Sequence, residues 1–204
     1  MFNAFGVNAY IISDETDEAV IIDGAVNSDR EMNTLRQYVS NNNLKIKYII
    51  NTHGHLDHIC GNNRLKNEYK VPVLANFNDN DMVANVANEA RMFGFIMDKQ
   101  SLPDINITEG DEIHFGNSCL KVLEIPGHSK GSVALYAKDD NFVVCGDALF
   151  CGSIGRTDLP GGSYAQLILS IKDKLFSLDR ECVVLPGHGG KTTIGYEIDN
   201  NPFF

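Results

Sequence analysis

Apolar and polar positions along this chain alternate in two blocks of short strands, each accompanied by segments with helical spacing. In the first block, residues 8–13 and 18–23 are rich in β-branched and aromatic side chains and flank a polar turn. Ser28 and Glu31 have the spacing of a capping box, so a helix is expected to begin there. The apolar run 46–51 then predicts a buried strand, which gives the order strand, strand, helix, strand.

The middle of the chain predicts mainly helices. Residues 61–69 and 80–91 have the composition and apolar spacing of helices. Residues 71–75 are typical of a short strand, and Pro72 places that strand at the edge of a sheet. The loop 93–103 is rich in apolar residues, and we expect it to contact the core rather than to form a lid over a site.

Strand-forming segments return in the second half, where Gly116-Asn117 is a hairpin signal. Ser163 and Gln166 predict a second capped helix over residues 164–178, and residues 193–199 are typical of a last helical turn or two. The strands expected here are residues 111–115, 118–125, 132–137, 142–145 and 181–185. Two such blocks pack most economically as two sheets face to face, with helices outside.

Length and composition indicate one folded domain, residues 1–204, because 204 residues with 43% hydrophobic side chains can bury a real core. No apolar run reaches the ~20 residues that span a bilayer, and Met1–Gly6 shows no signal peptide. Five cysteines without a C-x-x-C pair are typical of reduced, buried thiols. We therefore expect a cytoplasmic protein with no membrane partner.

The charge narrows the partners further. Lys and Arg number 17 against 27 Asp and Glu, which gives a net charge of −10. Such a surface repels nucleic acid and anionic membranes, so no nucleic-acid partner is expected. A small anionic substrate stays compatible with this charge if bound metal ions receive it.

Half of the six histidines lie in the segment that follows the apolar run 46–51. This segment carries His53, His55, Asp57 and His58. Imidazole and carboxylate groups hold divalent metals such as zinc, whereas packing gives no reason to gather so many polar atoms that need partners. A metal site is therefore the first hypothesis, and a polar loop after a strand is the alternative.

Four more candidate residues lie in loops after strands of the second block. They are His128, Asp147, Arg156 and His188. A glycine precedes each of them, which lets the backbone turn sharply where a strand ends. The remaining histidine, His114, alternates with apolar neighbours and is expected on the solvent face of a strand.

The order H-x-H-x-D-H, His, Asp, His over the whole chain resembles the metallo-β-lactamase superfamily. Within it the chain is most similar to the glyoxalase II group, especially its short bacterial members, through residues 146–150, 155–162 and 192–204. The resemblance implies an α/β fold of the αββα type, with two mixed sheets and helices on the outer faces. Zn²⁺ is the expected metal, with Fe or Mn as alternatives, and two ions are expected per chain.

The resemblance also implies which residues hold each ion. Metal one takes His53, His55 and His128, and metal two takes Asp57, His58 and His188. Asp147 bridges the two ions. Arg156 is expected to brace the site rather than to touch the substrate.

The implied activity is hydrolysis of a small, anionic thioester by a hydroxide that bridges the metals. Asp57, His55 and Asp147 carry the catalytic roles, and Asp57 orients the nucleophile or carries a proton. The alternative activity is that of a persulfide dioxygenase. These enzymes share the same motif, and the resemblance to them implies one iron held at the positions of His53, His128 and Asp147. A nuclease is disfavoured by the acidic charge.

Overall fold

The computed structural model describes residues 1–92 and 94–204, and its chain folds around two β-sheets. The first sheet has the strand order β1-β2-β3-β4-β5. Its strands are β1 (Tyr10–Ser13), β2 (Glu18–Ile22), β3 (Lys45–Ile50), β4 (Val73–Ala75) and β5 (Ile105–Asn106). Only β1 runs antiparallel to its neighbour, because β2, β3, β4 and β5 pair in parallel. The first sheet is therefore mixed.

The second sheet has the order β13-β12-β9-β8-β7-β6. Its strands are β6 (Glu112–Phe115), β7 (Ser118–Glu124), β8 (Val133–Ala137), β9 (Phe142–Gly146), β12 (Val183–Pro186) and β13 (Thr192–Thr193). The pair β9 and β12 is parallel, whereas the other pairs are antiparallel. A separate small hairpin pairs β10 (Leu149–Phe150) with β11 (Ser153–Ile154).

Alternation along the strands explains the layers. Val20 and Ile22 on β2 face the other sheet and pack with Val122 and Leu135. The residue between them, Ile21, faces the opposite way and packs under the helices. Strands buried on both faces need apolar residues at every position, and this is why β2 and β3 end in continuous apolar runs.

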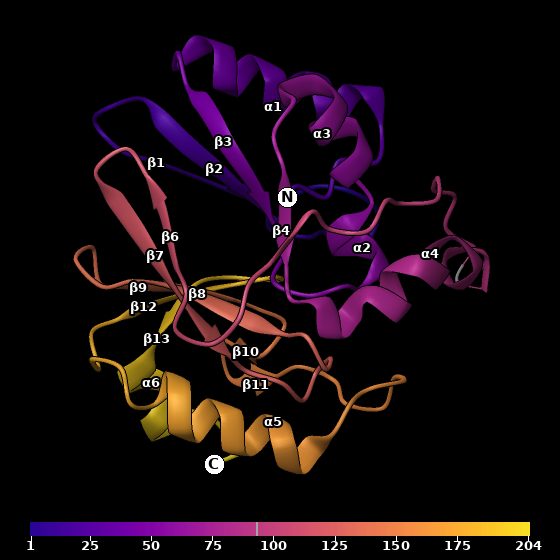
Figure 1. Ribbon diagram of the computed structural model, residues 1–204. Coiled ribbons are helices and arrows are strands. Elements are labelled where there is room, and N and C mark those ends of the chain that lie inside the picture. The colour runs from indigo at the N-terminus through magenta and orange to yellow at the C-terminus, as the bar shows by residue number, and fades with distance from the viewer. Residues whose placement is uncertain (93) are drawn as a thin grey trace.

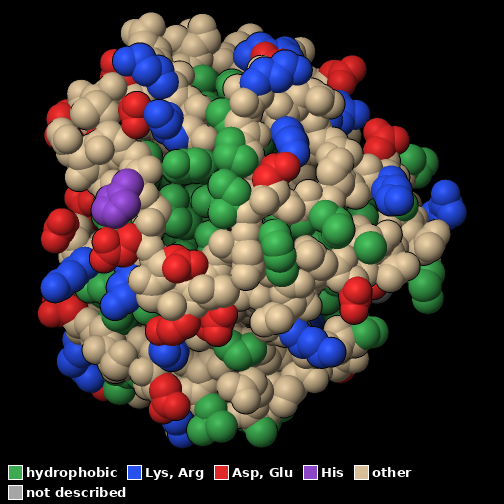
Figure 2. Space-filling model, in the orientation of Figure 1, with side chains coloured by type: hydrophobic (Ala, Val, Ile, Leu, Met, Phe, Trp, Pro, Cys, Tyr) green, Lys and Arg blue, Asp and Glu red, His purple; other side chains and the backbone are tan. Residues whose placement is uncertain are grey.

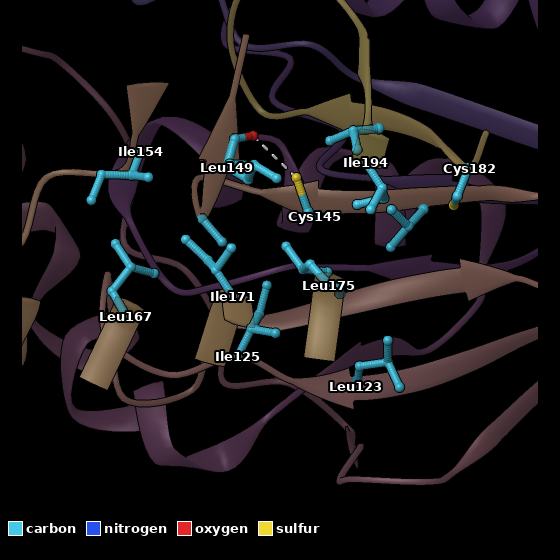
Figure 3. Packing of buried hydrophobic residues seen from close by; sticks show 14 residues of the cluster. Leu123, Ile125, Cys145, Leu149, Ile154, Leu167, Ile171, Leu175, Cys182 and Ile194 are labelled. Carbon is cyan, nitrogen blue, oxygen red and sulfur yellow. Dashed lines mark hydrogen bonds between the residues drawn. The ribbon is translucent and has the colours of Figure 1, made fainter. Parts of the chain in front are cut away.

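Helices cover the two outer faces (Figure 1). On the first sheet lie α1 (Asp29–Asn41) and α3 (Asn62–Tyr69). On the second lie α5 (Tyr164–Ser170), the π-helical segment η2 (Ile171–Leu175) and α6 (Ile194–Asn200). Figure 3 shows Leu167 pointing toward Ile154, and Ile171 and Leu175 pointing toward Leu149 and Cys145. The αββα sandwich with two mixed sheets is thus confirmed.

The helix starts follow the predicted caps. The Ser28 hydroxyl accepts from the Glu31 amide at 3.2 Å, and the Glu31 carboxylate accepts from the Ser28 amide at 3.0 Å. Such a cap stabilises a helix by about 1 kcal/mol. Ser163 caps α5 by accepting from the Gln166 amide.

Three predicted elements differ from the structure. The strand over 71–75 is not at an edge, because the two-residue strand β5 pairs with its outer side and Pro72 lies just before β4. The metal-ligand loop contains a short helix, α2 (Leu56–Ile59). The helix expected over 164–178 is α-helical only to Ser170, since a π-helical turn follows.

The apolar loop after α4 (Asn80–Met92) contacts the core, as predicted, through Phe95, which packs with Leu56 and Ile59. Phe93, where that loop begins, lies outside the described residues. All five cysteines are free, but the expectation that all are buried is wrong. Cys151 is exposed because it lies in the turn between β10 and β11, and Cys119 is half-buried on the outer hairpin.

Acidic and basic side chains are interspersed on the face drawn in Figure 2, with hydrophobic side chains gathered in a hollow where the upper and lower halves meet. No helix among the described residues is long and apolar enough to cross a membrane.

Candidate metal centre

Strand directions bring the candidate residues to one edge of the sandwich. In the second sheet β7, β9 and β12 run the same way, because β7 and β9 are both antiparallel to β8 and β12 is parallel to β9. Their carboxyl ends therefore meet, and His128, Asp147 and His188 follow those ends. The segment that carries His53 to His58 leaves the carboxyl end of β3 in the first sheet and joins them there.

The first group consists of His53, His55 and His128. Their candidate ligand atoms all lie within 4.8 Å of one another. His55 Nδ1 is 2.8 Å from His128 Nε2, and the ring of His53 lies 4.8 Å from each of the other two rings. His53 and His128 are almost fully buried. Three imidazoles so placed form one face of a metal site.

The second group consists of Asp57, His58 and His188, again with ligand atoms within 4.8 Å of one another. Asp57 Oδ2 lies 3.3 Å from His188 Nε2 and 3.7 Å from His58 Nε2. His58 is fully buried, whereas the side chain of His188 is 29% exposed. This group is therefore reachable from the outside.

Asp147 lies between the two groups. Its Oδ1 is 3.4 Å from His58 Nε2, and its Oδ2 is 3.5 Å from His188 Nε2 and 3.7 Å from His128 Nε2. Gly187 permits this approach, since a Cβ there would collide with Asp147 Oδ1. One carboxylate thus faces both groups.

Unpartnered buried atoms test whether this set fits metal ions. His53 Nε2, His58 Nε2 and Asp147 Oδ1 are buried and have no hydrogen-bond partner among the described residues. Buried polar atoms are normally satisfied, so three orphans converging on one place point to missing ligands. Imidazole nitrogens and carboxylate oxygens suit Zn²⁺, Fe and Mn. The buried clusters fit a dinuclear metal site.

Hydrogen bonds on the far side of the rings fix which nitrogen faces the site. Nδ1–H of His58 donates to Asp23 Oδ2 at 2.9 Å, and Nδ1–H of His53 donates to Thr52 Oγ1 at 3.0 Å. Nδ1–H of His128 donates to the carbonyl of Arg156 at 2.7 Å. In the neutral form of each ring the proton is then on Nδ1, and Nε2 is the nitrogen that can bind a cation.

Burial and charge shift the protonation of the histidines in opposite directions. Burial lowers the pKa of His53 well below its ordinary value and that of His55 to about 4, and neighbouring imidazoles add to both effects. Burial also disfavours charge on His58, but the carboxylates of Asp147 and Asp23 raise the pKa of this histidine well above 6.5. Burial opposes ionisation of Asp147, yet His58, His128 and His188 lower its pKa to about 2.

Two aspartates that support the site were missed in the sequence. Asp23 directly follows β2 and accepts from Thr52 as well as from His58. Asp79 accepts from the Gly54 amide, the Ser129 hydroxyl and the Gly131 amide at 2.7–2.8 Å. Asp23 could have been found in the sequence, because it is an acidic residue at the end of an apolar run. No local pattern distinguishes Asp79 from other acidic residues.

Arg156 contacts the site through its backbone rather than through its guanidinium. Its backbone carbonyl holds His128, while its guanidinium forms a two-pronged ion pair with Asp158 at 2.8 Å. His114 lies on the solvent face, as predicted, with its side chain 67% exposed.

A cavity of about 490 Å³ opens over the two groups. His55, Asp57, Asp147 and His188 form part of its floor. Apolar side chains form most of the remaining wall. A small molecule can therefore reach the candidate ligands from one side while the other side stays buried.

Comparisons with known proteins place this fold and site. A family model described as the metallo-β-lactamase superfamily matches residues 2–188. The probable metallo-hydrolase YqgX of Bacillus subtilis is 38% identical over 96% of this chain and 91% of its own length. The hydroxyacylglutathione hydrolase GloC of Haemophilus influenzae is 35% identical over 98% of this chain and 93% of its own.

A solved structure is also similar to this chain in both fold and sequence. The crystal structure of TTHA1623 in a di-iron-bound form has a TM-score of 0.88 and 35% identity, covering 99% of this chain and 97% of that one. Fold and site together define a metal-dependent hydrolase built on an αββα sandwich. The chain belongs to the metallo-β-lactamase superfamily.

Proposed function

We propose that this protein hydrolyses thioesters at a two-metal centre, as a member of the glyoxalase II type. The observation that carries the proposal is the position of Asp147 between two complete groups of three ligands. The similarity to GloC supports the thioester as the bond that is cleaved. Two bound divalent cations would lower the pKa of water from about 15.7 towards about 7 and polarise a carbonyl.

The seven candidate residues are proposed as ligands of the two ions. His53, His55 and His128 are proposed for one ion, Asp57, His58 and His188 for the other, and Asp147 for both. Zn²⁺ is the metal we propose, since its preference for imidazole and carboxylate matches the set. Iron, the metal of the TTHA1623 structure, and manganese are the alternatives.

Asp57 is proposed as the proton-handling residue. Burial opposes its ionisation, but the hydrogen bond from His188 and the nearby His58 lower its pKa below the ordinary value. The carboxylate is therefore ionised at neutral pH and accepts a proton rather than donating one. Its position on the cavity floor puts it within reach of a substrate.

Hydrolysis of thioesters by the zinc-loaded protein tests the proposal. Lactoylglutathione and a neutral acyl thioester would both be offered, with release of free thiol as the readout. Removing the metal with a chelator is expected to abolish hydrolysis, and added zinc to restore it. Equal rates before and after chelation would contradict the proposal, and so would failure on every thioester.

The persulfide dioxygenase alternative needs one iron per chain and oxygen uptake. The second group, Asp57, His58 and His188, would then have no ion to hold although His58 Nε2 lacks a partner. This favours two ions. Metal analysis after purification separates the two functions, because one iron with oxygen consumption would support the dioxygenase.

The proposed partner is a small molecule, in line with a cavity of about 490 Å³. Five free thiols support a reducing compartment such as the cytoplasm. The cavity wall does not support the anionic character expected of the substrate, because Arg156 is the one Lys or Arg among its described lining residues.

A further inference from the structure

Apart from the candidate metal ligands, Glu89 and Arg156, the wall of the cavity is apolar. The side chains that form this wall come from the N-terminal segment, α2, α4 and the loop after Arg156. They are Phe5, Leu56, Met82, Met92, Leu159 and Pro160. Methionine and aromatic walls adapt to apolar groups of varied shape and offer nothing to a carboxylate.

Positive charge is scarce at this wall. Among the described residues lining the cavity, Arg156 is the one Lys or Arg. Two of its five N–H donors, on Nε and Nη2, are taken by the Asp158 carboxylate at 2.8 Å. The charge of Asp158 offsets the charge that Arg156 brings to this wall.

A carboxylate on α4, that of Glu89, also lines the cavity. Its side chain makes no ion pair or hydrogen bond among the described residues. Burial raises its pKa, which reflects the lack of a partner. Glu89 also lines a smaller cavity of about 240 Å³ that shares Met82 and Pro160 with the first. There Asp79 and Asp81 bring the number of acids to three, against one cation, Lys130.

We propose that this cavity selects thioesters whose acyl and thiol parts are apolar and uncharged, and that Glu89 disfavours thiols that carry carboxylates. The inference deepens the proposed thioester hydrolysis and rests on it. Glutathione carries two carboxylates and one ammonium, so it would bring anions to a wall whose one guanidinium is paired with Asp158 and whose acid Glu89 is unpaired among the described residues. An uncharged thiol avoids this repulsion and gains from apolar contact.

Two thioesters with the same acyl group test the selectivity. The zinc-loaded protein would be assayed with S-hexanoyl-N-acetylcysteamine, which is uncharged, and with S-hexanoylglutathione. We expect kcat/KM to favour the uncharged thiol at least about tenfold, with the difference in KM. Glu89→Lys should reduce this preference about tenfold, and Glu89→Gln should reduce it less. Glu181→Lys, at an exposed site in the turn before β12, is the charge-matched control and should leave the preference unchanged.

Binding of two thioethers separates this inference from the proposed function, because thioethers are not hydrolysed. Calorimetry with S-hexyl-N-acetylcysteamine and S-hexylglutathione should show the same preference and the same dependence on Glu89. If the thioethers obey it while no thioester is hydrolysed, the proposed activity fails and the cavity selectivity stands. Equal or tighter binding of the glutathione form, unchanged by Glu89→Lys, would overturn the inference even if thioesters are hydrolysed.

Discussion

At this centre the pKa of a histidine depends on its surroundings, so that side chains of the same type differ in protonation. Imidazoles of the first group are kept neutral by burial and by one another, whereas His58 is kept charged by two carboxylates. Neutral imidazole is the form that binds a metal ion. The first group is thus ready for a cation, while an ion at the second group has to displace a proton from His58.

The stability of the metal-free protein should reach a maximum near pH 6.5. The pKa values of His53, His55 and His128 are lowered, so their contribution is present above pH 6.5 and is lost as pH falls towards about 4, the value for His55. The pKa values of His58 and His188 are raised, so their contribution is present below pH 6.5 and is lost at higher pH.

Urea unfolding at pH 4.5, 6.5 and 8.5 with a chelator present measures this dependence. The free energy of unfolding should be highest at the middle value. A free energy that rises steadily from pH 4.5 to pH 8.5 would contradict the assignment of raised pKa values to the second group.

Asp23 should control metal affinity without touching the metal. Asp23→Asn keeps the shape but removes the negative charge that holds His58 through Nδ1. Loss of such a supporting carboxylate typically weakens metal binding by about 10- to 100-fold. Competition with a chromogenic chelator measures the change.

Asp17→Asn, in an exposed turn where asparagine tolerates the positive φ of 65°, is the matched control for this substitution. It should leave affinity unchanged. Equal metal affinity in the Asp23 variant and this control would show that Asp23 does not control metal affinity.

Sequence patterns predicted the side chains that converge at the candidate metal centre better than those that support them from behind. His53, His55, Asp57 and His58 are close in the chain, so their shared chemistry is visible locally. Asp23 acts on His58 from 35 positions away. Only the pairing of β2 with β3 in parallel brings the ends of the two strands together, and no local spacing encodes that register.

Short elements position the site as much as the sheets do. The helix α2 begins directly after His55 and carries Asp57 and His58 on its single turn. Val83, Val86 and Ala90 on α4 pack against Leu56 and its neighbours. The 3₁₀ segment η1 (Phe77–Asp79) ends in Asp79, whose carboxylate ties the loop of His53 to the loop of His128.

Asp79→Ala should loosen both loops at once. It leaves the Gly54 and Gly131 amides buried without an acceptor, at a cost of about 1–3 kcal/mol for each group. We expect the free energy of unfolding to fall by about 3 kcal/mol and zinc affinity to fall at least tenfold. Chemical denaturation of the metal-free protein and chelator competition measure the two effects.

Asp81→Ala removes an exposed carboxylate two residues further on and serves as the comparison for Asp79→Ala. Its effect should stay within about 0.5 kcal/mol. A similar small loss in the Asp79 variant would show that the two loops are held by other contacts.

At the scale of the whole molecule, the sandwich brings the ends of strands from both sheets together at one edge. Its two strand blocks were predicted because apolar runs and turn signals are local. The inner position of β4 was not predicted, since it depends on β5, a strand of two residues with no pattern of its own. The cavity walls were also beyond local pattern, because Phe5, Met82 and Leu159 come from three distant segments.

Counting zinc ions per chain tests the central claim, that seven side chains on four loops hold two cations around Asp147. Purified protein loaded with zinc and freed of excess would be measured by mass spectrometry of the metal and by protein quantitation. Wild type and the His114→Ala control should hold two ions per chain, and Asp147→Ala one or fewer. Two ions retained in Asp147→Ala with unchanged affinity, or fewer than one in wild type, would contradict the account.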